Sequence, residues 1–135
     1  MNSIIVNTDG GSRGNPGPAA IGVVIKDETG KIVGSISRRI NETTNNVAEY
    51  SAVIAALEWI KENLNRETII QFFIDSALVV NQLNGLFKIK NPDIRNLVLK
   101  VRILEQGIAS KIIYNQIPRE KNQEADLLVN KALDA

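Results

Sequence analysis

The 135-residue sequence contains no cysteine and no histidine. Without cysteine, the chain has no disulfide, no thiolate nucleophile, no iron–sulfur cluster and no cysteine-based zinc site. Without histidine, it has no Ser–His–Asp triad, no imidazole general base and no imidazole metal ligand. Any chemistry it performs therefore depends on carboxylates, lysine, tyrosine, hydroxyls, amides or a bound hard cation. The lack of cysteine also fits a reducing compartment.

Long hydrophobic runs are missing as well. Uncharged apolar stretches reach about seven residues, far below the ~20 needed to cross a bilayer. The first residues, MNSIIVNTDGG, lack the basic stretch, apolar run and cleavage site of a secretory signal. Hydrophobic residues make up 44% of the chain and charged residues 23%, as is typical of soluble globular proteins. We therefore expect a cytoplasmic protein with no membrane partner, a single domain over residues 1–135, and a monomer.

The net charge of +1 hides an uneven distribution. Residues 86–121 carry eight basic and three acidic side chains, whereas residues 1–85 carry seven basic and nine acidic ones. The basic middle segment is either a phosphate-facing patch or a pair of solvated helix faces. Charge alone does not decide between these two interpretations.

The hydrophobic periodicity predicts five strands and four helices. Strands are expected at residues 3–9, 20–26, 31–40, 67–75 and 111–117, and helices at 44–64, 76–84, 92–106 and 122–133. The segment 10–18, rich in glycine and proline, is expected to be a loop. Short turns between the first three strands predict antiparallel pairing, and the helical crossovers predict parallel addition of the later strands. We predict an α/β fold with a mixed five-stranded sheet flanked by helices.

Four acidic residues occupy positions unlike those of the other acids. Asp9 and Asp75 follow apolar runs at the ends of predicted strands, where a buried carboxylate needs a partner. Glu49 lies one turn into the first long helix, and Asp126 lies near the start of the last helix. Ligands of open α/β sheets bind outside the carboxyl ends of the strands, so Asp9 and Asp75 meet there if their strands are neighbours. Each position also has a structural explanation, as a turn residue or as an acid favoured by a helix dipole.

Converging carboxylates would have a chemical consequence. Several carboxylates within a few ångströms cannot all stay ionised without a counter-charge. That counter-charge is either arginine or lysine, or a hard divalent cation such as Mg²⁺ or Mn²⁺, which prefers oxygen ligands. Two such ions about 4 Å apart form the usual clamp for phosphodiester cleavage.

Four motifs follow one another along the chain: TDGGSRGNPGPA at 8–19, TTNNVAEY at 43–50, IDS at 74–76 and NQEAD at 122–126. Together with LVVNQLNG at 78–85 and KIKNP at 88–92, they resemble the type 1 ribonuclease H family in its compact prokaryotic form. The resemblance covers nearly the whole chain. It implies the ribonuclease H-like fold and hydrolysis of the RNA strand of RNA–DNA hybrids with two Mg²⁺ or Mn²⁺ ions per site, leaving 3′-hydroxyl and 5′-phosphate ends.

The resemblance also implies roles for individual residues. The carboxylates that would bind metal and carry catalysis are Asp9, Glu49, Asp75 and Asp126. Asp9 would bridge both ions, and Glu49 would also accept from an RNA 2′-hydroxyl. The substrate contacts implied are the backbone of Gly10, Gly11 and Ser12 and the side chains of Asn15 and Asn45 at the minor groove. Further candidates for substrate contact are Ser76, Lys88, Lys90 and Arg119. Such contacts suit a hybrid, which is recognised by shape and 2′-hydroxyls rather than by base edges.

The sequence departs from the family pattern in two places. Many members carry a histidine in the loop before the last catalytic acid, whereas this loop reads IPREKN at 117–122. Arg119, Glu120 and Lys121 are the candidates to replace it. The basic helix-and-loop of some bacterial members is not evident, which leaves Lys88 and Lys90 as the nearest candidates for phosphate contacts. Two alternatives stay open: a nuclease of the same fold that cuts double-stranded RNA or a DNA junction, and a catalytically weak module that binds hybrids.

Overall fold

Five strands form one mixed sheet in the computed structural model, which describes residues 3–64 and 67–135. The strands are β1 (Ser3–Ser12), β2 (Gly17–Lys26), β3 (Ile32–Thr43), β4 (Ile69–Ile74) and β5 (Lys111–Gln116). Their order across the sheet is β3-β2-β1-β4-β5. β2 runs antiparallel to β1 and β3, while β4 runs parallel to β1 and β5. The predicted arrangement, antiparallel first and parallel later, is confirmed.

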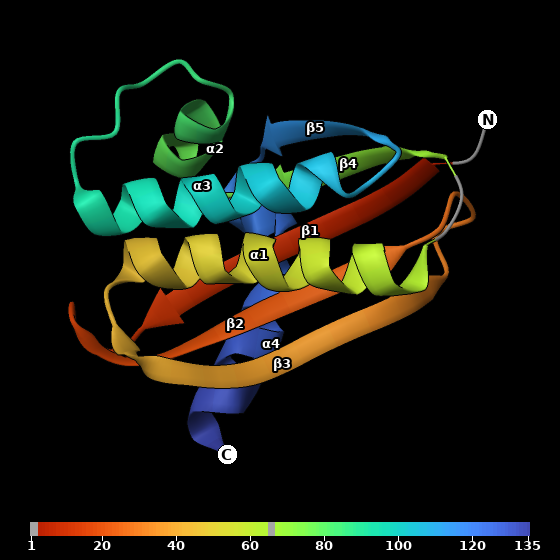
Figure 1. Cartoon of the computed structure of the whole chain (residues 1–135). Coiled ribbons are helices and arrows are strands. Elements are labelled where there is room, and N and C mark those ends of the chain that lie inside the picture. Colours follow the sequence, from red (N-terminus) through yellow and green to blue (C-terminus); the bar gives the residue numbers. More distant parts are fainter. Residues whose placement is uncertain (1–2, 65–66) are drawn as a thin grey trace.

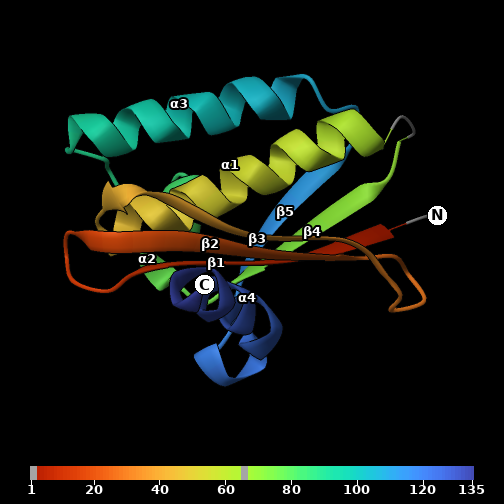
Figure 2. The same ribbon diagram turned by 90° about the horizontal axis from the view of Figure 1, so that it is seen from below.

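Helices cover both faces of this sheet. They are α1 (Asn45–Asn63), α2 (Ala77–Leu83), α3 (Pro92–Gln106) and α4 (Gln123–Asp134), with a 3₁₀ turn η1 (Arg119–Lys121) before α4. α1 and α3 lie along one face, and α4 lies on the opposite face (Figures 1 and 2). Among the described residues, none of the helices combines the length and hydrophobicity that a membrane span requires.

The helix starts follow from local capping. The side chain of Thr44 accepts a hydrogen bond from the backbone N–H of Val47 at 3.3 Å, which fixes the start of α1. Asn91 caps α3 in the same way, accepting from two backbone N–H groups at 2.8 and 3.2 Å, and a proline follows it in the first turn. Because α1 begins at Asn45, Glu49 comes one turn into the helix, as predicted.

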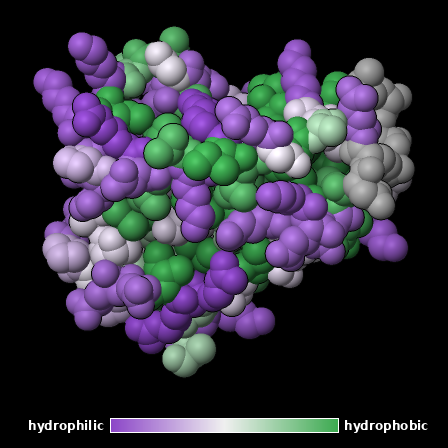
Figure 3. Space-filling model, in the orientation of Figure 1, coloured by the Kyte–Doolittle hydropathy of each residue, from purple (hydrophilic) through white to green (hydrophobic). Residues whose placement is uncertain are grey.

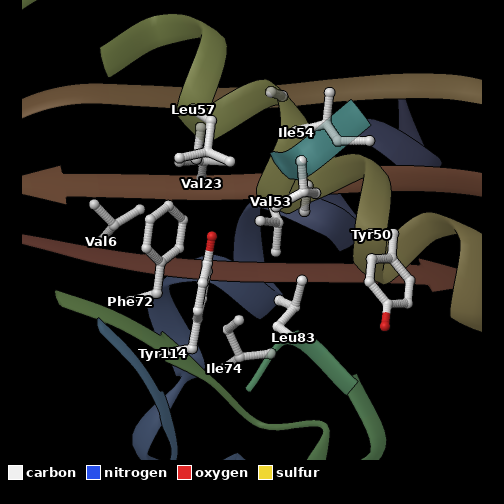
Figure 4. Close-up of a cluster of buried hydrophobic side chains, with 14 of the residues drawn as sticks. Val6, Val23, Tyr50, Val53, Ile54, Leu57, Phe72, Ile74, Leu83 and Tyr114 are labelled. Atoms are coloured by element: carbon white, nitrogen blue, oxygen red, sulfur yellow. The ribbon is translucent and has the colours of Figure 1, made fainter. Parts of the chain in front are cut away.

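The main core lies between the sheet and α1. Val6, Phe72 and Tyr114 from the sheet face Val53 and Leu57 of α1, and all five side chains are buried (Figure 4). The rings of the two aromatic residues lie 5.2 Å apart, centroid to centroid. Burying one such side chain contributes roughly 1.5–3 kcal/mol, so this layer holds α1 firmly on the strands that carry the acids.

The opposite face has a smaller apolar cluster, formed by Ala20, Val129 and Ala132. Small residues there bring α4 close to the sheet. A Cβ added to Gly22 of β2 would fall 2.2 Å from the carbonyl oxygen of Ala125 in α4. The first turn of α4, which carries Asp126, therefore rests directly on the sheet.

The β1–β2 hairpin is longer than predicted, and this corrects the expected loop over residues 10–18. Pairing between the two strands continues to Ser12 and Ala19, and β2 begins at Gly17, so the turn contains only residues 13–16. The prediction was wrong because glycine and proline are weak strand formers by themselves, while strand pairing depends on the tertiary surroundings. β3 also continues past its predicted end, to Thr43.

The face covered by α1 and α3 is mostly hydrophilic, with hydrophobic patches between the polar side chains (Figure 3). On α3, Leu99 and Ile103 are more than half exposed, at 59% and 60%. Single exposed apolar side chains are ordinary on a globular protein surface.

Candidate active site

Asp9 and Asp75 lie side by side because their strands are parallel neighbours. The register pairs Thr8 of β1 with Ile74 of β4, and each aspartate is the next residue along its chain. The condition set by the sequence, that the two strands be adjacent, is therefore met. The sequence predicted that Asp9 would be the last residue of its strand. That prediction was wrong, because β1 continues to Ser12.

Glu49 reaches this pair from α1, which crosses β1 at Gly10. A Cβ on Gly10 would fall 2.2 Å from the carbonyl carbon and oxygen of Ala48, so only glycine permits this approach. The backbone N–H of Gly10 donates to Oε1 of Glu49 at a long 3.4 Å. One oxygen from each of Asp9, Glu49 and Asp75 lies within 4.8 Å of the other two. Asp9 is only 8% exposed and Glu49 only 9%.

Asp126 stands at the rim of this group. It lies in the first turn of α4, its side chain is exposed, and Nδ2 of Asn130 donates to its Oδ2 at 3.4 Å. Its negative charge reaches Asp9, where it contributes to raising the pKa of that carboxyl. The structure thus brings three of the four acids into one cluster and places the fourth beside it.

The cluster holds more negative charge than its surroundings neutralise. Burial, reinforced by the charge of Asp75, raises the pKa of Asp9 from 3.8 to about 7. Burial, followed by the charge of Asp9, also raises the pKa of Glu49 well above its usual 4.5. Oε2 of Glu49 is buried and has no hydrogen-bond partner among the residues that the structure describes. Oxygen ligands, excess negative charge and an unpaired buried oxygen together fit a hard divalent cation.

A cavity of about 480 Å³ opens onto these carboxylates. The four acids line it together with six further residues that the sequence singled out: Gly10, Gly11, Ser12, Asn45, Ser76 and Arg119. Asn15 and Lys90 instead line a second hollow of about 400 Å³, and Asn46 belongs to both hollows, so the two are adjacent. Lys88 lines neither of them.

Three polar residues of this region also have structural roles. Oδ1 of Asn45 accepts from the backbone N–H of Ser12 at 2.9 Å, and Oδ1 of Asn15 accepts from the backbone N–H of Asn45 at 3.0 Å. These two bonds join the β1–β2 turn to the start of α1 and use only the amide oxygens. Oγ of Ser76 accepts from the backbone N–H of Val79 at 3.2 Å and caps α2.

Sequence reasoning missed other residues of the cavity wall. These are Arg13, Asn46, Val129, Asn130 and Leu133. Arg13 reaches across to α4, where its guanidinium lies 2.7 Å from Oδ1 of Asp134. The motifs contained Arg13 and Asn46 but suggested no role for them. The residues of α4 can be recognised as part of the cavity wall only once the packing of α4 on the sheet is known. The buried Asn122, which donates to Asp75, was also missed, because this contact depends on how the chain packs before α4.

Comparison with known proteins gives consistent matches along the chain. A family model described as reverse transcriptase-like matches residues 7–132. Ribonuclease HI of Halobacterium salinarum is 43% identical over 126 residues, covering 93% of this chain and 62% of that protein. The bifunctional protein Rv2228c of Mycobacterium tuberculosis is 39% identical over 137 residues, covering 98% of this chain. The chain spans only 36% of the length of that mycobacterial protein.

Solved structures agree with these matches. The structure of LC11-RNase H1, isolated from compost by a metagenomic approach, is 46% identical and superimposes with a TM-score of 0.93, covering 99% of this chain and 97% of that one. A second structure of LC11-RNase H1, in complex with an RNA/DNA hybrid, is 44% identical with a TM-score of 0.93, covering 97% and 96% of the two chains.

Proposed function

Because the chain belongs to the type 1 ribonuclease H family, we propose that it is an endoribonuclease that hydrolyses the RNA strand of RNA–DNA hybrids. The observation that carries this proposal is the cluster of Asp9, Glu49 and Asp75, whose oxygens lie within 4.8 Å of one another beside an open cavity. Two of these carboxylates are almost fully buried, which destabilises a cation-free protein. A module that only binds hybrids has no use for such a cluster.

The carboxylates of Asp9, Glu49, Asp75 and Asp126 would hold two Mg²⁺ ions, with Mn²⁺ as the alternative. When bound, such ions lower the pKa of a water molecule and stabilise negative charge on the attacked phosphate and the leaving oxygen. The fold supplies the rigid frame for them: two parallel strands, and two helices pressed against the sheet through Gly10 and Gly22.

The proposed reaction joins the oxygen of a water molecule to the phosphorus and breaks the bond between phosphorus and O3′. The departing O3′ takes up a proton and becomes a 3′-hydroxyl, and the phosphate stays on the 5′ end of the other product. The chain contributes Glu49, which accepts from the 2′-hydroxyl next to the cleaved bond. This contact would make the reaction specific for the RNA strand, since DNA lacks that hydroxyl.

The walls of the two hollows suit the minor groove of a hybrid. The amide oxygens of Asn15 and Asn45 are used within the protein, which leaves their NH₂ groups as donors toward minor-groove acceptors and 2′-hydroxyls. Gly10 and Gly11 carry no side chains and allow close approach of a sugar. Arg119 at the first hollow and Lys90 at the second supply positive charge for phosphates. The hybrid complex of LC11-RNase H1, at 44% identity, supports this assignment of substrate.

From the size of the chain, we keep the monomer and a single ribonuclease H domain over residues 1–135 as proposals. We keep the cytoplasm as the proposed location, on the sequence arguments alone.

The test is a cleavage assay on matched RNA–DNA, RNA–RNA and DNA–DNA duplexes, in Mg²⁺ and in EDTA. We expect cleavage of the RNA strand of the hybrid in Mg²⁺ only, and none with Asp9→Asn or Asp75→Asn, both of which should remain folded by circular dichroism. Equal cleavage of RNA–RNA duplex would favour the broader nuclease. Hybrid binding without cleavage would favour the binding module, and full activity of both variants would remove the carboxylates from the mechanism.

A further inference from the structure

The side chain of Asn122 contacts both β1 and Asp75, the residue that follows β4. Asn122 lies between η1 and α4 and is 1% exposed. Its Nδ2 donates to the carbonyl oxygen of Thr8 at 2.9 Å and to Oδ2 of Asp75 at 3.2 Å. Thr8 directly precedes Asp9 along β1. One amide group therefore links the backbone next to Asp9 to the carboxylate of Asp75.

A second amide completes the hydrogen bonding of Asn122. Nδ2 of Asn7, which lies two residues before Asp9 on the same face of β1, donates to Oδ1 of Asn122 at 3.1 Å. An asparagine amide has a donor end and an acceptor end. The carbonyl of Thr8 and the carboxylate of Asp75 can only accept, so the orientation of Asn122 that satisfies both directs its NH₂ group at them, and Oδ1 is left to accept from Asn7.

The backbone of Asn122 also supports the fourth acid. Its carbonyl oxygen accepts from the backbone N–H of Asp126 at 3.1 Å, the first such bond of α4. A displacement of Asn122 would therefore shift the carboxylate of Asp75 and the start of the helix that carries Asp126 at the same time.

We propose that Asn122, held at its acceptor end by Asn7, is a positioning residue that holds the carboxylate of Asp75 in the geometry needed for a divalent cation. The inference rests on the proposed metal-binding function of the acids. A neutral donor on one carboxylate oxygen restrains the rotation of the group without cancelling its charge. Asn122 is not part of the cavity wall, so it acts through Asp75 and not on the substrate. Partners of this kind, one step removed from a metal, typically alter cation affinity or activity by about 10–100-fold when they are removed.

The experiment compares three variants that replace an amide by an apolar group of similar size: Asn122→Leu, Asn7→Leu and the control Asn115→Leu. Asn115 is a matched control because its Nδ2 also donates to a backbone carbonyl on a neighbouring strand, that of Phe72, at 3.1 Å. Its other acceptor is Oε1 of Gln71 at 3.3 Å, so both acceptors are neutral oxygens. For each protein, urea unfolding gives the stability, calorimetry without substrate gives the Mn²⁺ affinity, and hybrid cleavage at a fixed subsaturating Mn²⁺ concentration gives kcat and KM.

We expect Asn122→Leu to lose about 10–100-fold in Mn²⁺ affinity, with a lower kcat and an unchanged KM for the hybrid. Asn7→Leu should lose affinity to a smaller extent, and Asn115→Leu should keep the affinity of the wild type whatever stability it loses. A folded Asn122→Leu protein with wild-type affinity would overturn the proposal. If that variant does not fold, wild-type affinity in Asn7→Leu overturns it instead. A wild-type protein that binds Mn²⁺ but does not cleave the hybrid would contradict the proposed function and leave this inference standing.

Discussion

Gly10 and Ala48 are packed backbone against backbone, so closely that a Cβ on Gly10 would fall 2.2 Å from the carbonyl carbon and oxygen of Ala48. This contact is the point at which α1 crosses β1. It places Glu49, the residue after Ala48, next to Asp9, the residue before Gly10. The spacing of these two carboxylates is therefore set by the absence of a side chain between them.

The first prediction concerns Gly10→Ala. The added methyl group meets backbone atoms, which cannot rotate away, so α1 and β1 must separate. We expect a loss of about 1–3 kcal/mol in the free energy of unfolding, measured in urea, and weaker Mn²⁺ binding because Glu49 moves away from Asp9. The matched control is Gly11→Ala, whose Cβ would meet only Cγ1 of Val129 at an ordinary 3.5 Å. Equal effects of the two substitutions would contradict the role given to the contact with Ala48.

The second prediction concerns pH and Asp9. Because burial raises its pKa from 3.8 to about 7, the folded protein keeps the proton over a range in which the unfolded chain has lost it. The folded state binds more protons there, so the stability of the metal-free protein falls as pH rises from about 4, and the full penalty is present above about 7. Asp9→Asn removes this penalty. We expect it to raise the free energy of unfolding by about 1–4 kcal/mol at pH 8 in EDTA, and by much less at pH 4.

Urea unfolding at the two pH values measures this difference. The control is Glu28→Gln, in the exposed turn between β2 and β3. It should change the free energy of unfolding by a similar small amount at pH 4 and at pH 8. If Asp9→Asn stabilises the protein no more at pH 8 than at pH 4, then Asp9 is not held in a desolvated site crowded by other carboxylates.

The third prediction separates stability from activity. The hydroxyl of Tyr114 donates to Oε2 of Glu105 at 2.6 Å, and burial raises the pKa of Tyr114, so the group remains a donor throughout the working range of pH. Tyr114→Phe should lower the free energy of unfolding by about 1–2 kcal/mol, because a hydrogen bond to a carboxylate is lost. The kinetic constants for hybrid cleavage should not change, since neither residue lines the cavity at the acids. A large fall in kcat with intact folding would mean that this network reaches the site.

The fourth prediction concerns the two lysines that the sequence offered for phosphate contacts. Lys90 borders the second hollow, whereas Lys88 borders neither hollow. Lys90→Ala should reduce the slope of log KM against log salt concentration by about 1, the value for one lost phosphate contact. Lys88→Ala should change that slope less. A larger effect of Lys88 would place the hybrid on a different path across the surface.

The fold was largely predictable because its signals are local. Asn91 followed by Pro92 predicted the start of α3, and Gly107 its end, and both bounds agree with the structure. The short turn at 27–30 predicted an antiparallel hairpin, and the helical connections predicted parallel strands. The extent of β1 and β2 was not predictable in the same way. Gly10 and Gly11 favour a loop when read alone, and they continue the strand only because β2 pairs with them and helices cover them.

The acidic residues of the site could be predicted from the sequence, but the contacts that hold them in place could not. The sequence could indicate that Asp9 and Asp75 meet if their strands are adjacent, and the register now pairs the residues just before them. The bond from Asn122 to the carbonyl of Thr8 joins positions 114 residues apart, and the ion pair of Arg13 with Asp134 crosses nearly the whole chain. Such contacts depend on how α4 packs on the sheet, which no local pattern specifies. The catalytic roles of the acids remain predictions.

The central claim is that these acids hold two divalent cations against the RNA strand. Anomalous diffraction from crystals of the protein bound to an RNA–DNA hybrid and soaked briefly with Mn²⁺ tests it most directly. The account predicts two anomalous peaks about 4 Å apart among Asp9, Glu49, Asp75 and Asp126, with Asp9 in contact with both. A hybrid seated at the cavity with no peak among these carboxylates, or with its peaks elsewhere, would contradict the account.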